Sequence, residues 1–167
     1  TQGVSSAASD VYKRQPLKQA PESKIIMFRN SNGKEEHFAI VVGEGLSVKE
    51  PLVRLHSQCL TGDVFGSLKC DCGEQLQTAL SLMSNEGAGV VLYLAQEGRD
   101  IGLLNKIRAY ALQDAGLDTI EANHSLGFDT DERGFSTAVE MLDLLELSHI
   151  KLSVSYTHLT LPTILLV

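Results

Sequence analysis

Two short apolar runs joined by turn residues open the interpretable part of the chain. Residues 24–29 and 36–42 are rich in Ile, Phe and Val, and an Asn-Ser-Asn-Gly segment follows the first run. Such residues favour strands, and Asn-Gly between two apolar runs is typical of a hairpin turn. The pattern predicts an N-terminal β-hairpin, followed after a Gly-containing loop by a further strand at residues 52–57.

Periodic apolar residues later in the chain predict helices. Leu76, Ala79, Leu80 and Met83 recur at helical spacing until Gly87. Residues 89–95 form a nearly continuous apolar run, typical of a strand covered on both faces. From residue 101 the spacing is helical again, with a C-terminal stop at Gly116 and an apolar stripe of Ile101, Leu104, Ile107 and Ala111.

The last third continues the alternation. A short strand is expected at residues 118–122, a polar stretch rich in titratable groups fills 123–133, and a strand begins at 150. Between them a helix is expected to carry Phe135, Val139, Leu142 and Leu145. Together these elements predict an α/β fold, a single domain with a mixed β-sheet, flanking helices and the N-terminal β-hairpin.

Composition narrows the class of protein. The chain has 167 residues, 43% of them hydrophobic, and a net charge of −7, which suits one domain and argues against broad nucleic-acid binding. An anionic ligand therefore has to be held by a local cluster of arginines. No apolar stretch is long enough to span a membrane and no signal peptide is recognisable, and the odd cysteine count favours a reducing, cytoplasmic location.

All three cysteines, Cys59, Cys70 and Cys72, lie in the segment 54–75. Thiolates are the ligands that zinc prefers, and a Cys-x-Cys pair turns two sulfurs toward one centre. The segment therefore predicts one zinc site, either open to water or closed by His56 as a fourth ligand. The alternative is three ordinary buried thiols.

The turn at residues 96–100 is a second candidate for chemistry. It joins a strand to a helix N-terminus, where unpaired backbone N–H groups bind anions. The alternative is a simple loop with a solvated arginine.

The two ends of the chain look foreign. The hexapeptides at 10–15 and 154–159 are compatible with inverted copies of one DNA element, and they resemble a transposon-end adapter from library preparation. We therefore expect residues 1–15 and 154–167 to be non-native flanks around a domain at 16–153, whose own C-terminal part is missing.

Several separated motifs, in order, carry a family resemblance. The segments 54–63, 67–75, 96–110 and 121–124, together with residues 131–133, resemble GTP cyclohydrolase II, the zinc enzyme of riboflavin biosynthesis. The resemblance implies a hydrolase that opens the imidazole ring of GTP at carbon 8 and releases formate and pyrophosphate. It also implies one Zn²⁺ per chain, Mg²⁺ on the GTP phosphates, and a homodimer.

The resemblance also implies site residues. Cys59, Cys70 and Cys72 would bind zinc, whose remaining position carries an activated water. Arg133 would be the nucleophile toward the α-phosphorus or would stabilise phosphate charge, with Asp131 as proton acceptor and Tyr110 near the ring chemistry. The matching GTP contacts are Arg54, Leu55, His56, Ser57, Gln58, Gln75, Glu97, Gly98, Arg99 and Thr119.

The chain departs from the family pattern at two places. Gln58 stands where the family often has glutamate, and Val154 and Leu159 replace a threonine and a lysine that contact substrate. We therefore expect zinc binding but poor turnover of GTP. The first rival function is a non-catalytic zinc module in which His56 completes a structural site. A nucleobase deaminase is a weaker rival, since its His-x-Glu and Pro-Cys-x-x-Cys motifs are missing.

Overall fold

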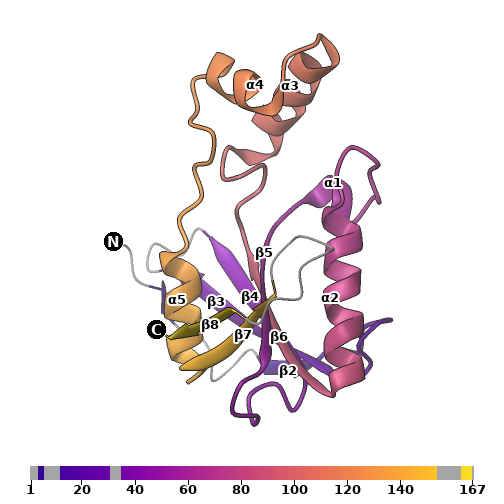
Figure 1. Cartoon of the computed structure of the whole chain (residues 1–167), viewed down its shortest axis with the longest axis vertical. Coiled ribbons are helices and arrows are strands. Elements are labelled where there is room, and N and C mark those ends of the chain that lie inside the picture. The colour runs from indigo at the N-terminus through magenta and orange to yellow at the C-terminus, as the bar shows by residue number, and fades with distance from the viewer. Residues whose placement is uncertain (1–3, 6–11, 31–34, 154–162, 167) are drawn as a thin grey trace.

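A mixed β-sheet forms the body of the computed structural model, which describes residues 4–5, 12–30, 35–153 and 163–166. The strands are Val4–Ser5 (β1), Tyr12–Arg14 (β2), Ser23–Asn30 (β3), Glu36–Gly43 (β4), Leu52–Ser57 (β5), Ala88–Leu94 (β6), His149–Ser153 (β7) and Thr163–Leu166 (β8). They lie in the order β1-β3-β4-β6-β5-β7-β8, and β2 also pairs with β3 (Figure 1).

The strand directions confirm the predicted mixed sheet. β3 and β4 pair antiparallel as the expected hairpin, and β4 pairs antiparallel with β6. β5 lies parallel to both β6 and β7. Parallel neighbours require a crossover connection, and the segment between β5 and β6 supplies one that contains all three cysteines.

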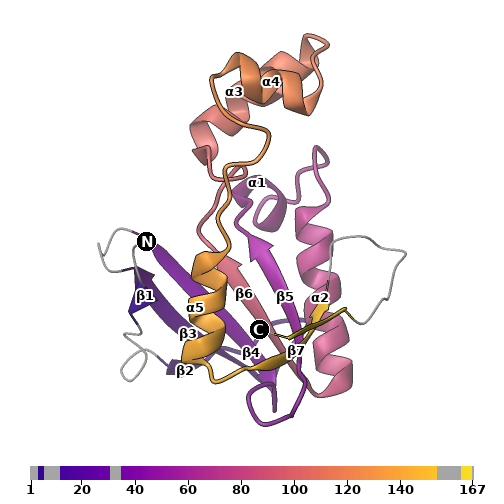
Figure 2. The same cartoon turned by 60° about the vertical axis from the view of Figure 1, so that its left-hand side comes forward.

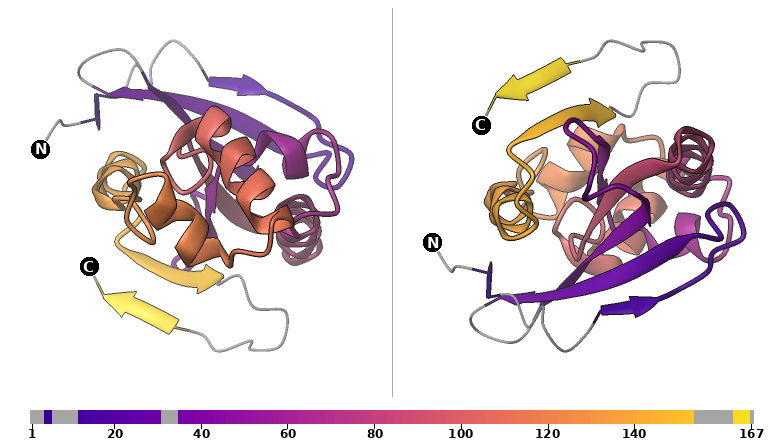
Figure 3. Two further views of the ribbon diagram at one scale, coloured as in Figure 1. Left: turned by 90° about the horizontal axis from the view of Figure 1, so that it is seen from above. Right: turned by 90° about the horizontal axis from the view of Figure 1, so that it is seen from below.

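One helix covers each face of the sheet. The helices of the described residues are Leu60–Asp63 (α1), Cys72–Glu86 (α2), Gly102–Asp114 (α3), Thr119–Ser125 (α4) and Ser136–Leu144 (α5). Figure 3 shows α2 and α5 on opposite sides of the strands. α5 buries Ala138, Met141 and Leu142 against one face, and α2 buries Leu76, Ala79, Leu80 and Met83 against the other.

The expected strand at residues 118–122 is wrong, because this segment begins helix α4. The Asp118 carboxylate accepts hydrogen bonds from the N–H groups of Ile120 and Glu121, and the Glu121 carboxylate accepts one from the N–H of Asp118. This reciprocal arrangement is a capping box, which satisfies the free N–H groups of a helix start. The short strand expected from these five residues did not outweigh it.

Helix α3 is confirmed, and Ile101 of the expected apolar stripe is buried, but the rest of that stripe does not face the core. Leu104 and Ile107 are 66% and 48% exposed, whereas the buried residues of the helix are Lys106 and Ala109. α3 and α4 stand beyond the ends of β5 and β6, away from the sheet faces (Figures 1 and 2). The helix therefore turns a lysine inward, toward the loops that follow those strands.

Parts of the expected flanks take part in the sheet. β2 pairs with β3, and β8 pairs with β7. The expected hairpin turn at residues 31–33 and the adapter-like hexapeptide at 154–159 lie outside the described residues. Within the described part of the chain, no helix has the length and apolar character needed to cross a bilayer.

Candidate metal centre and substrate pocket

The three thiols converge at the point where β5 passes into α1 and where α2 begins. Their sulfur atoms all lie within 4.8 Å of one another, and Sγ of Cys59 is 3.5 Å from Sγ of Cys70. Zinc–sulfur bonds of about 2.3 Å at tetrahedral angles would separate sulfurs by about 3.8 Å. The cluster therefore has the dimensions of a zinc site.

The charge balance of the cluster also fits a cation. Burial raises the pKa of the Cys72 thiol, and its neighbours Cys59 and Cys70 raise it further. Three ionised sulfurs at this separation repel one another, and a bound dication removes that repulsion because coordinated thiols are deprotonated. The residues present thus suit Zn²⁺.

Gly62 makes room for the sulfurs. A Cβ atom at this position would lie 2.9 Å from Sγ of Cys70 and 3.1 Å from Sγ of Cys59. The first distance is shorter than real Cβ atoms show and the second is tight, so a larger residue here would force the sulfurs to move.

His56 is engaged elsewhere. Its Nε2 lies 3.1 Å from both oxygens of Asp63, and its side chain is 3% exposed. The Asp63 carboxylate also accepts hydrogen bonds from the Tyr93 hydroxyl and the Cys59 N–H. Among the described residues, the metal-binding group contains the three cysteines and no histidine.

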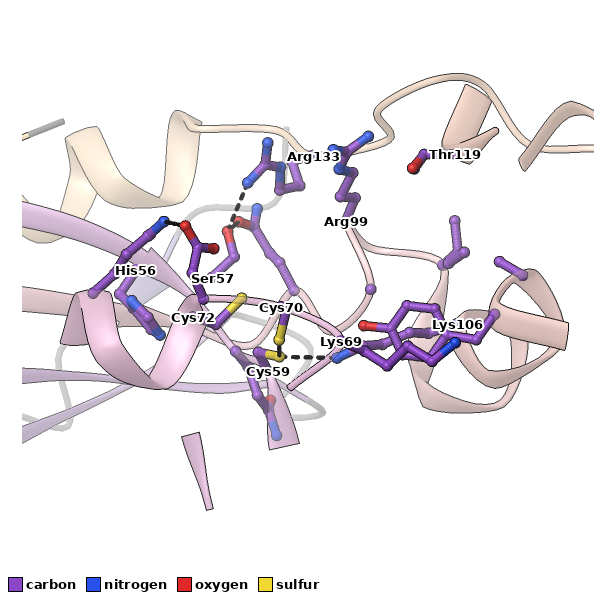
Figure 4. A pocket seen from close by; sticks show the side chains of 18 of the residues that line it. His56, Ser57, Cys59, Lys69, Cys70, Cys72, Arg99, Lys106, Thr119 and Arg133 are labelled. Carbon is purple, nitrogen blue, oxygen red and sulfur yellow. Dashed lines mark hydrogen bonds between the residues drawn. The ribbon is translucent and has the colours of Figure 1, made fainter. Parts of the chain in front are cut away.

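Lys106 contacts the cluster from helix α3. Its Nζ donates to Sγ of Cys59 over 2.9 Å and to Oε1 of Glu97 over 2.7 Å. Burial opposes ionisation of the Cys59 thiol, but the hydrogen bond from Lys106 and others from Gly62 and Thr61 outweigh burial and lower its pKa. Figure 4 shows this contact beside the three sulfurs.

A pocket of about 340 Å³ opens over the cysteines. Arg54, Arg99 and Arg133 line it together with Lys69 and Lys106, so the pocket is cationic although the whole chain is acidic. This volume falls in the range of small-molecule sites. The local arginine cluster required for an anionic ligand is therefore present.

Arg54 is held rigidly in the pocket wall. It is 4% exposed, and its Nη2 donates to Oε1 of Gln75 over 2.6 Å. The amide of Gln75 in turn donates to the carboxylate of Asp71. This chain links β5 to the first turn of α2, so the predicted residues Arg54 and Gln75 act as one unit.

The turn before α3 has an unusual backbone. Gly98, Arg99 and Asp100 have φ values of 66°, 61° and 74°. A Cβ at Gly98 would lie 3.0 Å from Cβ of Lys106, so glycine is needed here on two counts. Two consecutive non-glycine residues in the left-handed region store strain, which is common at ligand sites. The Arg99 side chain lies on the pocket wall.

Arg133 and Asp131 form a two-pronged ion pair. Nε of Arg133 donates to one carboxylate oxygen over 2.8 Å and Nη2 donates to the other over 2.5 Å. The carboxylate raises the pKa of the Arg133 guanidinium, and the guanidinium lowers the pKa of Asp131. Nη1 of Arg133 also lies 3.4 Å from the hydroxyl of Ser57, so the pair reaches the end of β5.

Most of the predicted site residues meet in this pocket. Its lining includes Arg54, Leu55, His56, Ser57, Gln58, Cys59, Cys70, Cys72, Gln75, Gly98, Arg99, Tyr110, Thr119 and Arg133. Glu97 and Asp131 are not among the lining residues, and both use their carboxylates on neighbouring cations.

Two residues of the site, Lys106 and Asp63, were not predicted from the sequence. Lys106 is four residues before Tyr110 and therefore shares its helix face, which was the available indication. Asp63 is the last residue of the segment 54–63, and nothing in its distance from the cysteines along the chain marks it as a site residue. Gln96, Gln113 and Asn123 also line the pocket without having been predicted.

Comparison with known proteins identifies relatives over most of the chain. Residues 10–158 match the family model described as GTP cyclohydrolase II. The GTP cyclohydrolase-2 of Proteus mirabilis is 58% identical over 131 residues, which is 78% of this chain and 66% of that protein. The GTP cyclohydrolase-2 of Haemophilus influenzae (strain PittGG) is 53% identical over 130 residues, 77% of this chain and 60% of that protein.

The GTP cyclohydrolase-2 of Azospirillum brasilense is 50% identical over 139 residues, 83% of this chain but 36% of that protein. The chain thus spans between 36% and 66% of the length of these relatives. A solved structure of RibBX, a two-domain 3,4-dihydroxy-2-butanone 4-phosphate synthase, covers 95% of this chain at 16% identity and a TM-score of 0.49, too low a likeness to bear on function. The family model and the identities, which extend across the thiol cluster and its pocket, show that this chain belongs to the GTP cyclohydrolase II family.

Proposed function

We propose that this chain binds GTP, opens the imidazole ring of its guanine at carbon 8, and releases formate and pyrophosphate in the first step of riboflavin biosynthesis. One observation carries the proposal: three thiols of zinc-site dimensions form the wall of a pocket that also gathers three arginines. The reaction needs ligands for zinc, which the thiols supply, and cationic groups for the triphosphate, which the arginines supply.

Cys59, Cys70 and Cys72 would hold one Zn²⁺. When bound, zinc lowers the pKa of water, so that hydroxide can attack carbon 8 near neutral pH. His56 donates to Asp63, which supports an open site over a structural site closed by histidine. X-ray absorption at the zinc edge distinguishes them: three sulfurs and one oxygen fit the enzyme, and three sulfurs and one nitrogen fit a non-catalytic zinc module.

The purine would lie between the metal centre and helix α3. Tyr110 lines the pocket, and its ring centroid is 5.9 Å from Nζ of both Lys69 and Lys106. A hydroxyl in this position can donate a proton to the opening ring or orient it. Residues 54–58, Gln75, Gly98, Arg99 and Thr119 would hold the nucleotide, with Mg²⁺ bridging its phosphates.

Arg133 would act on the α-phosphate through its charge. Its ion pair with Asp131 favours the protonated guanidinium, and a protonated guanidinium is a poor nucleophile. The fork of N–H donors instead suits stabilisation of developing negative charge on phosphate oxygens. The alternative, a covalent intermediate on Arg133 with Asp131 as proton acceptor, requires the ion pair to open.

We also propose a homodimer in the cytoplasm. Leu104, Ile107 and Ile120 on α3 and α4 are 66%, 48% and 46% exposed, which supports a covering partner for these helices. The three free thiols suit a reducing compartment.

The test is to incubate the zinc-loaded chain with GTP and Mg²⁺ and to assay formate and pyrophosphate separately. The proposal expects both products at a low rate, because Val154 and Leu159 stand where the family resemblance implies a threonine and a lysine that contact substrate. It also expects chelation of zinc to abolish formate release. Release of ammonia in place of formate, or formate release that chelation leaves unchanged, would contradict it.

A further inference from the structure

The buried Lys106–Glu97 ion pair makes hydrogen bonds both to the side chain of Cys59 and to the backbone next to it. Nζ of Lys106 donates to Sγ of Cys59, and the Glu97 carboxylate that holds this ammonium accepts the N–H of Leu60 through its second oxygen, over 2.7 Å. Leu60 directly follows Cys59. One end of the pair thus holds the sulfur and the other holds the next peptide group.

We propose that Lys106 and Glu97 are positioning residues of the metal centre, which fix the side chain and the backbone of Cys59 in the geometry needed to bind the ion. The inference deepens the proposed function and rests on it for the identity of the metal. Groups that hydrogen-bond a ligand atom from outside the coordination shell orient that ligand and increase metal affinity.

Burial supports a structural purpose for the pair. The side chains of Lys106 and Glu97 are 9% and 10% exposed. Buried charges are costly unless every charged group is paired and hydrogen-bonded. Here Nζ of Lys106 and both carboxylate oxygens of Glu97 have hydrogen-bond partners. Such a pair is retained where it orders something, and the groups that it orders are Cys59 and Leu60.

The contacts of Glu97 assign it to the metal side of the site. The family resemblance places this residue among the GTP contacts, but both of its carboxylate oxygens already accept hydrogen bonds from the protein. It is also not among the residues that line the pocket. These contacts favour a role of Glu97 at the metal ligand Cys59 over a direct contact with GTP.

The same pair ties helix α3 to the metal. Lys106 and Ala109 are the buried residues of α3, so the lysine is a principal attachment of this helix to the loop after β5. Tyr110 lies one turn further along the same face. Loss of the lysine contact should loosen Cys59 and the placement of Tyr110 together.

The test measures metal binding without any nucleotide. Co²⁺ is titrated into the metal-free full chain, its thiolate-to-metal and d–d absorption bands are recorded, and Zn²⁺ affinity is measured by competition with a chromophoric chelator. For Lys106→Met, which removes the ammonium and keeps an unbranched side chain of similar size, we expect Zn²⁺ affinity to fall about 10- to 100-fold and the Co²⁺ bands to shift.

Glu97→Gln should weaken binding in the same direction, and the double variant should cost little more than Lys106→Met alone, because the two residues act as one unit. The matched control is Arg108→Met, which removes an exposed cation from the same helix and should leave Zn²⁺ affinity unchanged. Lys106→Arg retains the charge and serves if Lys106→Met does not fold, with an intermediate affinity expected.

Wild-type Zn²⁺ affinity and wild-type Co²⁺ bands in Lys106→Met would overturn the inference. If only Lys106→Arg folds, the same result in that variant overturns it, provided that its N–H groups no longer reach Cys59. A raised KM for GTP with unchanged metal affinity would also overturn it, because Lys106 would then be a substrate contact. A wild-type chain that binds Co²⁺ through thiolates yet releases ammonia in place of formate from GTP contradicts only the proposed function.

Discussion

The Asp63 carboxylate receives the ring of His56 with Nε2 at 3.1 Å from each of its oxygens. An ionised carboxylate only accepts, so Nε2 of His56 carries the proton in this contact. The carboxylate also accepts the Tyr93 hydroxyl over 2.6 Å and the Cys59 N–H over 3.0 Å. A side chain outside the metal cluster therefore connects β5, β6 and the first metal ligand.

Asp63→Asn should destabilise the metal-free protein by about 1–3 kcal/mol, because it leaves buried donors without a full set of acceptors. The free energy of unfolding, measured with urea at pH 7 in the presence of chelator, checks this. Asp143→Asn, at an exposed position of α5, is the control and should have no effect beyond about 0.5 kcal/mol. Equal stability of Asp63→Asn and wild type would mean that the network contributes nothing.

The same carboxylate predicts a pH dependence. Burial opposes its ionisation, but the hydrogen bonds from His56 and Tyr93 outweigh burial and lower the pKa of Asp63 in the folded chain. A lowered folded-state pKa stabilises the fold fully above the ordinary carboxyl pKa of about 3.9, and this stabilisation is lost as the pH falls through the folded value. The gap in unfolding free energy between wild type and Asp63→Asn should shrink as the pH falls below about 4. A gap that stays constant to pH 3 would contradict this assignment.

Gly62→Ala should weaken zinc binding. Its Cβ would lie 2.9 Å from Sγ of Cys70, and overpacking of this kind costs about 1–3 kcal/mol. If the sulfurs move to relieve the contact, zinc affinity falls by about 5- to 150-fold. Competition with a chromophoric chelator measures the change. Gly134→Ala is the matched control, since nothing lies within 4 Å of a Cβ built there.

Replacement of Arg133 should show whether this residue acts through its positive charge or as a nucleophile. Arg133→Gln should reduce pyrophosphate release about 100- to 1,000-fold, as expected on loss of one charge-stabilising donor, and Arg133→Lys should retain part of the rate. Single-turnover assays with separate detection of formate and pyrophosphate measure both variants. A phosphorylated or nucleotidylated Arg133 trapped by rapid quenching and found by mass spectrometry would instead establish the covalent route.

Zinc should stabilise the chain through its thiols. A ligand at 100 times its Kd that binds only the folded state adds about 2.7 kcal/mol to the unfolding free energy. Zn²⁺ should therefore raise the Tm of the wild type but not that of Cys72→Ser, in which the cluster has lost one sulfur. Mg²⁺ prefers oxygen ligands and should have no such effect without nucleotide. An equal response of both chains to Zn²⁺ would place the binding elsewhere.

Local patterns in the sequence were sufficient for most of the fold. The bounds of β5 and the start of α2 near the cysteine pair follow from apolar periodicity. A strand with one buried face has apolar residues at alternate positions, and a helix with one buried face has them about one turn apart. The expectation failed for residues 118–122, where a capping box starts a helix in place of the expected short strand. It also failed for the buried face of α3, which turns Lys106 inward instead of Leu104.

By itself, the sequence indicated the three thiols as candidate metal ligands and the mixed α/β architecture, since these follow from residue type and spacing, whereas Arg54, Arg99 and Arg133 were assigned through the family resemblance. Only the tertiary structure decided that His56 serves Asp63 and that Lys106 reaches Cys59 across 47 positions of the chain. The reason is that periodicity records whether a side chain is buried but not what it meets. Those partners are chosen when the parallel pairing of β5 and β6 brings the loops after both strands to one edge of the sheet.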